Sequence, residues 1–109
     1  MKQLEVWWAT LPQPVGRRPV LLLSRTSALA YLSRVLVAEV TTTIRNIPQE
    51  VTLGRREGLA GPCVANLDAL RTVPLSCLTA PLGRVGPNRA VEVKRALGHV
   101  LHWPELTSL

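Results

Sequence analysis

Two groups of side chains in this sequence are suited to holding a phosphate. Arg17 and Arg18 come directly before an apolar stretch, and a second apolar stretch ends in three consecutive hydroxyl residues, Thr41, Thr42 and Thr43. Arginine presents a rigid fork of charged N–H donors and threonine a short hydroxyl, so together they can bind a phosphodiester without a metal ion. Either group alone is ordinary for a β protein. Their combination predicts a phosphodiester site, and we expect RNA to be cut there.

The sequence offers little support for other kinds of catalytic centre. It contains no Ser-His-Asp, P-loop or metal-ligand pattern. His99 and His102 lie three residues apart on an expected helix, on the side opposite Val93, Leu97 and Leu101, which predicts a solvated surface. No third ligand lies near them in the sequence, so we expect neither a zinc site nor a cofactor.

The three tryptophans have different expected roles. Trp7 and Trp8 are neighbours in the first expected strand, so one should point into the protein and the other outward. An outward ring can stack on unpaired bases, and Trp8 is the candidate for this role. For at least one of the pair the alternative is a ring that seals the core or a dimer interface. Trp103, just past the expected helix, is expected to close the core.

Several further arginines adjoin expected strands and could join a basic groove that contacts a nucleic-acid backbone. They are Arg25, Arg34, Arg45 and Arg71. The sequence does not choose among them, and Arg45 is included among the candidate RNA-binding residues.

The elements that must position these side chains are short strands followed by one helix. The expected strands cover residues 4–10, 19–24, 34–42, 51–53, 63–67 and 82–85, and residues 70–73 continue or restart the fifth. Short strands separated by turn residues predict a small β barrel rather than βαβ units. After Pro87 apolar residues recur at helical spacing until Pro104, which predicts one amphipathic helix packed against the barrel. The arginine pair and the threonines would then meet at one rim.

The composition fits one globular domain, residues 1–109, that associates with a polyanion. The chain is 47% hydrophobic, which argues against intrinsic disorder, and its 13 basic residues leave a formal net charge of +6. A domain of this size often needs a partner subunit, so a dimer is expected. Cys63 and Cys77 have no metal or redox spacing, and no segment resembles a signal peptide or a membrane span. We therefore expect two free thiols and a cytoplasmic location.

The chain resembles the MazF/PemK toxins over nearly its whole length. The matching segments are Val6 to Trp8, Gly16 to Leu21, Val37 to Thr42, Gly58 and Leu59, Val64, Leu67 to Val73, and Leu82 to Val85 followed by the final helix. The Arg-Pro-Val segment and the downstream Arg-Thr-Val segment are specific in combination, although each is weak alone. The resemblance implies a mainly β (α+β) fold, a small SH3-like barrel of the MazF/PemK/CcdB type with a C-terminal helix.

The resemblance also implies an activity. Such a protein is a metal-independent, sequence-specific endoribonuclease toxin of a type II toxin–antitoxin system, a homodimer held inactive by an acidic MazE-like antitoxin. Its substrate is single-stranded RNA (mRNA, rRNA or tRNA), cut to 2′,3′-cyclic phosphate and 5′-hydroxyl ends. The family's catalytic arginine, directly before the proline, falls on Arg18, and its catalytic threonine, at the end of the next long strand, falls on Thr41. No residue is assigned as the general base.

Substrate binding is assigned to residues around this pair: Trp8, Arg17, Thr42, Thr43, Arg45, Asn66 and Asp68. Relatives often carry an acidic residue and Gln ahead of the Arg-Thr pair, where this chain has Asp68 and Ala69 with Asn66 upstream. These regions line the RNA channel in the family, so the sequence does not predict which bases are recognised. Two alternatives remain: a CcdB-like toxin directed at gyrase, which needs no Arg-Pro and Thr pair, and a non-catalytic SH3-like binding module.

Overall fold

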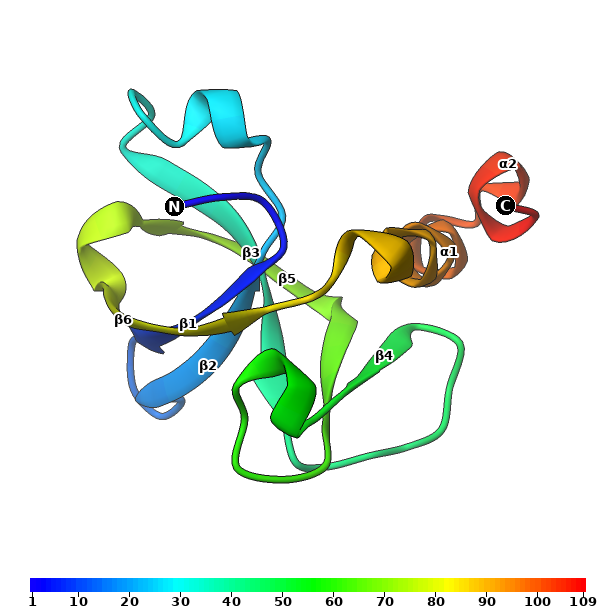
Figure 1. Cartoon of the computed structure of the whole chain (residues 1–109), viewed down its shortest axis with the longest axis horizontal. Coiled ribbons are helices and arrows are strands. Elements are labelled where there is room, and N and C mark those ends of the chain that lie inside the picture. The colour runs from blue at the N-terminus through cyan, green and yellow to red at the C-terminus, as the bar shows by residue number, and fades with distance from the viewer.

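A computed structural model describes residues 1–109 and builds them around one six-stranded antiparallel sheet (Figure 1). The strands adjoin in the order β4-β5-β3-β2-β1-β6. Two helices follow the last strand. The elements are β1 (Glu5–Thr10), β2 (Arg17–Leu22), β3 (Arg34–Thr41), β4 (Glu50–Leu53), β5 (Cys63–Pro74), β6 (Leu78–Arg84), α1 (Ala90–Leu101) and α2 (Pro104–Thr107).

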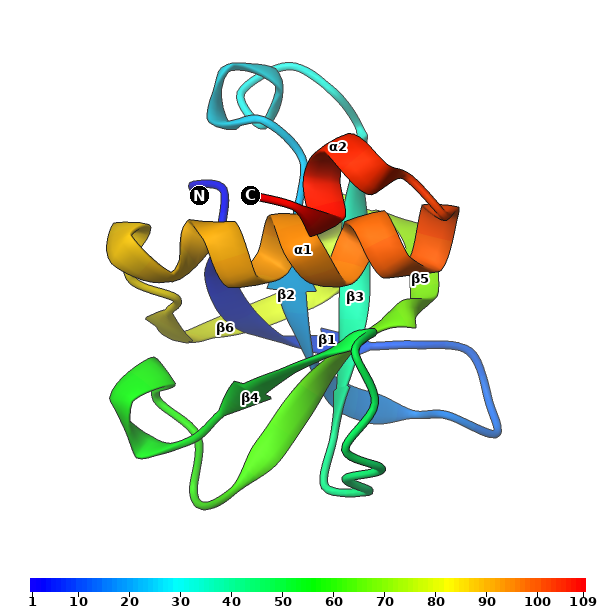
Figure 2. The ribbon, with the colours of Figure 1, turned by 90° about the vertical axis from the view of Figure 1, so that its right-hand side faces the viewer.

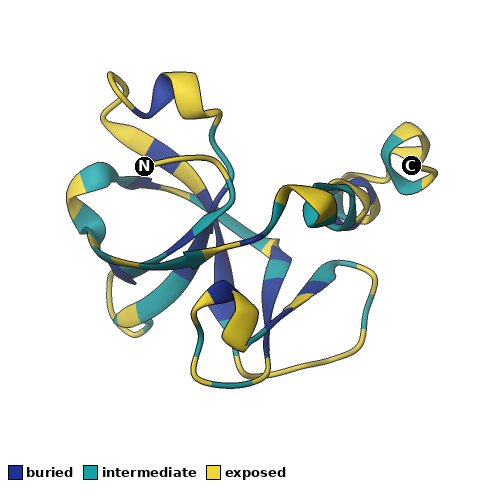
Figure 3. Ribbon diagram, in the orientation of Figure 1, coloured by how far each residue is buried: buried dark blue, intermediate teal, exposed yellow.

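The curled sheet buries a core on each face, because successive side chains of a strand point to opposite sides. Leu21 belongs to a first core that α1 covers, and Figure 2 shows this helix lying across the sheet. Val20 and Leu22 belong to a second core on the other face. Figure 3 shows the buried positions gathered where the strands meet, with exposed loops around them. Side chains near the end of a strand can therefore lie on either of two separate faces of the sheet.

The predicted fold class is confirmed: the protein is mainly β, a curled half-barrel with a C-terminal helix. Two strand predictions are corrected. Residues 63–67 and 70–73 form a single strand, because the ladder between β3 and β5 shifts register without ending. The last strand covers Leu78–Arg84 instead of 82–85, because its ladder with β1 begins at Leu78, which pairs with Ala9, and continues to Arg84, which pairs with Glu5.

The C-terminal helix forms as predicted, but its last turn is not buried. Val93 faces the first core, whereas Leu101 and Trp103 are each 50% exposed, so Trp103 does not close the core. His102 ends α1 with a left-handed φ of 51° and turns the chain into α2. His99 and His102 are exposed, as predicted. Neither helix has the length and apolar character needed to cross a bilayer.

Gly58 is expected to tolerate no side chain. It follows the 3-10 turn at Arg55–Glu57 with a φ of 87°, and a Cβ atom there would overlap the carbonyl oxygen of Leu82 on β6. Left-handed strain and overpacking together should make Gly58→Ala lower the free energy of unfolding by about 2 to 4 kcal/mol. Urea denaturation measures this loss.

Gly61→Ala is the control for that change. A Cβ atom at Gly61 has open space, and its φ lies outside the left-handed region, so its unfolding free energy should stay within about 0.5 kcal/mol of wild type. Equal losses in the two variants would contradict the packing of the turn against β6.

Candidate active site

Arg18 and Thr41 line one hollow of about 300 Å³ at one end of the sheet. Arg18 is the second residue of β2, and Thr41 is the last residue of β3. Each is an even number of residues from a member of the second core, Val20 and Val37 respectively, so both side chains belong to that face. Both are partly exposed. The other residues that line the hollow are Glu39, Thr43, Arg45, Asn66 and Ala69.

Glu39 is the residue of this hollow that the sequence interpretation missed. It lies in β3 two residues before Thr41 and is 8% exposed. Its Oε1 accepts a hydrogen bond of 3.0 Å from Nη1 of Arg18, and its Oε2 lies 2.7 Å from Nη2 of Arg71. The sequence does contain a feature that could have identified it: Glu39 is an acidic residue between the apolar Ala38 and Val40. A charge at such a buried position requires oppositely charged partners.

The loop between β3 and β4 brings Thr43 and Arg45 to the hollow. The backbone N–H of Thr43 donates to the Thr41 hydroxyl at 3.1 Å, which turns the chain directly after β3. The Glu50 carboxylate at the start of β4 accepts N–H bonds from Arg45 and Asn46, at 3.1 Å and 3.0 Å from its Oε1. Thr41 at the end of β3 and Thr43 and Arg45 in the turn that follows thus all reach the hollow.

A register shift in β5 decides which residues of that strand reach the hollow. On β3, Ala38 pairs with Leu70, but the next residue, Glu39, pairs with Asn66, so residues 67–69 bulge out of the ladder. Asn66 and Ala69 line the hollow. Asp68, a predicted substrate-binding residue, is exposed outside it, and its backbone N–H donates to Asn66 Oδ1 at 2.9 Å.

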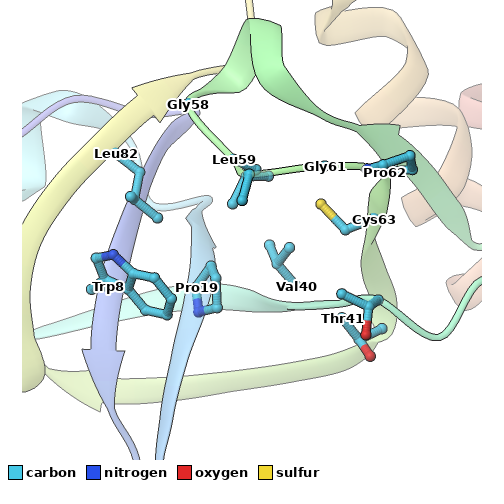
Figure 4. Close-up of a pocket in the computed structure, with 12 residues that line it drawn as sticks. Trp8, Pro19, Val40, Thr41, Gly58, Leu59, Gly61, Pro62, Cys63 and Leu82 are labelled. Carbon is cyan, nitrogen blue, oxygen red and sulfur yellow. The ribbon is translucent and has the colours of Figure 1, made fainter.

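The remaining predicted residues lie around a second, apolar cavity of about 470 Å³ on the other face (Figure 4). Trp8 and Thr42 line this cavity, and Thr41 borders both spaces. The guanidinium carbon of Arg17 lies 4.1 Å from the centre of the Trp8 ring, which is a cation–π contact. The predicted rim is therefore divided between two faces, with Thr41 at the boundary.

The tryptophan pair lies with one ring on each face of the sheet, as the alternation predicts, but both residues are partly buried and neither points fully outward. Trp7 packs against the second core and donates its indole N–H to Glu5 Oε1 at 3.1 Å. Trp8 borders the apolar cavity instead. Of the two rings, Trp7 is therefore the one that packs against the second core.

Cys63 lies in the wall of the apolar cavity, but its thiol is not activated. Burial raises the pKa of Cys63 above its ordinary value of 9.0, and the nearby Glu57 charge acts in the same direction. The thiol therefore stays protonated at neutral pH. No group of three or more His, Cys, Asp or Glu side chains in the structure is arranged to hold a metal ion.

Comparison with known proteins identifies the family. The family model described as PemK-like, MazF-like toxin of type II toxin-antitoxin system matches residues 2–101. The probable endoribonuclease MazF5 of Mycobacterium tuberculosis is 39% identical over 94 residues, which are 85% of this chain and 85% of that protein. The chain belongs to the MazF/PemK toxin family. Endoribonuclease MazF3 of the same species is 33% identical over 79% of this chain and 85% of that protein.

Solved structures of MazF toxins share this fold. Toxin MazF-mt6 of Mycobacterium tuberculosis superimposes with a TM-score of 0.85 at 30% identity, covering 90% of this chain and 96% of that one. A mycobacterial endoribonuclease in complex with its cognate antitoxin gives a TM-score of 0.81 at 27% identity, covering 95% and 97%. These matches confirm the prediction of a MazF-type endoribonuclease toxin of a toxin–antitoxin system.

Proposed function

We propose that this MazF/PemK-family chain cleaves single-stranded RNA without a metal ion, with Arg18 and Thr41 as its catalytic residues. Support comes from the polar hollow that these two residues line together with Thr43, Arg45 and Asn66. Three elements far apart in the sequence supply it, and its two arginines and two threonines offer the donors that a phosphodiester needs. That shared hollow is the observation that carries the proposal.

The proposed reaction uses the RNA's own 2′-hydroxyl as nucleophile. The 2′-hydroxyl gives up its proton as a bond forms between the 2′-oxygen and phosphorus, the bond to the 5′-oxygen breaks, and the 5′-oxygen takes up a proton, so no net proton is gained or lost. Negative charge builds on the five-coordinate phosphate, where donors already aimed at it are most effective. Arg18 uses one N–H group on Glu39 and keeps other donors for the phosphate. Thr41 would orient the phosphate through its hydroxyl.

Other parts of the molecule would hold the RNA around this centre. Thr43, Arg45 and Asn66 would contact the backbone or a base beside the cut, because they line the same hollow. Trp8, Arg17 and Thr42 would bind a neighbouring nucleotide at the apolar cavity that Thr41 also borders. Asp68 would act at the outer edge, since it lies beyond the hollow. Single-stranded RNA suits such a surface because its bases can be splayed apart.

We also propose an acidic antitoxin as partner and a homodimer as the active form. One relative was solved with its cognate antitoxin, and a formal charge of +6 favours an acidic segment over the arginine-lined hollow. The exposed apolar side chains of Tyr31, Leu32 and Leu36 would suit a second copy of the chain. The expected compartment is the cytoplasm, where unpaired RNA and the antitoxin would meet the toxin.

The test is cleavage of bacterial RNA by the purified protein in EDTA, with the new ends mapped. We expect cuts at a short sequence, leaving 2′,3′-cyclic phosphate and 5′-hydroxyl ends, and at least tenfold slower cutting by Thr41→Val. Thr42→Val is the neighbouring control and should cut faster than Thr41→Val, because Thr42 lies outside the Arg18 hollow. Intact RNA together with inhibited gyrase would favour a CcdB-like toxin, and tight RNA binding without cleavage a binding module.

A further inference from the structure

Glu39 is an unusual residue for a phosphate-binding hollow. Only two acidic residues of the protein are buried, Glu39 with 8% and Glu57 with 4% of the whole-residue surface exposed. A carboxylate at this place repels the RNA backbone and must also give up most of its hydration. Its presence beside Arg18 therefore needs a reason connected with the site.

The sheet brings Glu39 between two arginines. Glu39 on β3 pairs with Val20 on β2, and Arg18 lies two residues before Val20 on the same face. On the other side, Arg71 of β5 pairs with Val37, two residues before Glu39. Diagonal cross-strand neighbours of this kind are within reach of long side chains.

Each carboxylate oxygen of Glu39 is committed to a different arginine. Oε1 lies 3.0 Å from Nη1 of Arg18, and Oε2 lies 2.7 Å from Nη2 of Arg71. The Arg18 and Arg71 side chains are 36% and 33% exposed, while the Glu39 side chain is 11% exposed. The charged triad therefore consists of a buried carboxylate residue between two partly exposed arginines.

This arrangement fixes a side chain that would otherwise move. A free arginine samples many rotamers, and restricting it at the moment of reaction lowers the rate. Because Arg18 makes its hydrogen bond to Glu39 through Nη1, its other N–H groups remain free for the hollow. Since each carboxylate oxygen is already paired with an arginine, Glu39 is suited to holding the Arg18 guanidinium in place.

We propose that Glu39 is a positioning residue of the cleavage site. Its ion pair with Arg71 fixes the carboxylate, and the carboxylate in turn orients the Arg18 guanidinium towards the scissile phosphate. This inference rests on the proposed function. It also implies a compromise: the fixed negative charge weakens RNA binding while it raises the rate of the chemical step.

The decisive variant is Glu39→Gln, which keeps the shape and removes the charge. We expect the single-turnover cleavage rate at saturating RNA to fall by between about 10-fold and 100-fold. Binding of a non-cleavable 2′-O-methyl oligonucleotide carrying the mapped cut site should be equal or tighter, because one negative charge is gone. A residue that served only stability would not produce this opposite change in rate and affinity.

A double-mutant cycle tests whether Glu39 acts through Arg18. Adding Glu39→Gln to Arg18→Ala should cause no further loss of rate, because the side chain that it positions is already absent. Glu57→Gln is the matched control, since Glu57 is equally buried and paired with Arg89 but does not line the hollow. It should lower the melting temperature and leave the cleavage rate of the folded protein unchanged.

The outcomes separate this inference from the proposed function. An unchanged rate in Glu39→Gln, a full further loss in the Arg18→Ala background, or an equal loss in Glu57→Gln would overturn the positioning role. If Arg18→Ala itself cuts as fast as wild type, the proposed function fails first. Should Glu39→Gln not fold, Glu39→Asp replaces it: the charge stays but retreats by one methylene, so the rate should fall without tighter RNA binding.

Discussion

Arg18→Ala is expected to slow RNA cleavage by about a hundredfold to a thousandfold, the usual loss of about 2.7 to 4 kcal/mol when one preorganised donor is removed from a transition state. The loss should appear in the rate at saturating RNA, because the phosphate gains most of its charge after binding. Stability should change little, since Arg18 is partly exposed and Glu39 keeps its ion pair with Arg71. Single-turnover kinetics with an oligonucleotide carrying the mapped site measure the effect.

Two other arginines serve as comparisons for this variant. Arg34→Ala should cut as wild type does, because Arg34 begins β3 at the end opposite Thr41 and bonds only to the carbonyl of Thr72, at 2.9 Å. Arg17→Ala should weaken RNA binding more than the chemical step, since Arg17 lies over Trp8 outside the hollow. A rate for Arg18→Ala within tenfold of wild type would remove Arg18 from the catalytic role.

Arg89→Ala is expected to cause the largest loss of stability among the surface arginines. Arg89 joins three elements: Nη1 lies 3.3 Å from Glu57 Oε2, Nη2 donates to the Thr52 carbonyl at 2.7 Å, and Nε donates to Glu92 at 2.8 Å. The Glu57 side chain is only 6% exposed, so its charge would be left buried. Breaking such a pair costs about 3 to 5 kcal/mol. Urea denaturation measures the change.

The control and the rescue for Arg89 follow from the same contacts. Lys94→Ala, an exposed change on the same helix, should alter the free energy of unfolding by less than about 0.5 kcal/mol. Adding Glu57→Gln to Arg89→Ala should recover part of the loss, because a neutral amide is cheaper to bury than a carboxylate. A double variant less stable than Arg89→Ala alone would contradict the assignment of the loss to an unpaired charge.

The Arg89–Glu92 contact also has a pH signature. The hydrogen bond from Arg89 lowers the pKa of Glu92 below its ordinary value of 4.5, although burial opposes the shift. A carboxyl with a lower pKa in the folded state stabilises the protein above pH 4.5, and this contribution disappears as the pH falls through the folded pKa. Wild type should therefore lose this part of its stability in acid, and Arg89→Ala should lose less, because only the charge of Arg95 then lowers the pKa of Glu92.

Much of the fold was predictable because the strands have clear local patterns. The apolar segments around Val20 and Val37 are bounded by prolines, glycines and polar turns, and they form β2 and β3 close to the predicted positions. The continuous β5 was not predictable in the same way. Its register shift after Asn66 depends on pairing with β3, a long-range contact that no local pattern carries.

The residues of the site were largely predicted, but not their distribution between two separate spaces. Thr41 ends β3 at the boundary of the two spaces, and Thr42, directly after the strand, lines only the apolar cavity. Residues that the sequence placed on one rim therefore border a polar hollow and an apolar cavity. The partners of Glu39 could not be foreseen, since they depend on which strands flank β3. Trp103 stays exposed because the left-handed His102 directs the chain away from the sheet, a backbone choice that the apolar spacing does not reveal.

Arg18, Thr41 and Asn66 of the hollow lie on β2, β3 and β5, which are all inside the sheet with a neighbouring strand on both sides. Backbone amides of such strands open only when the sheet as a whole comes apart, whereas edge strands and loops fray at much lower free energy. Heating or denaturant should therefore abolish RNA cutting at the cooperative transition and not before it. In deuterium oxide, the backbone N–H groups of Val20 and Val37 should be among the last to exchange hydrogen for deuterium.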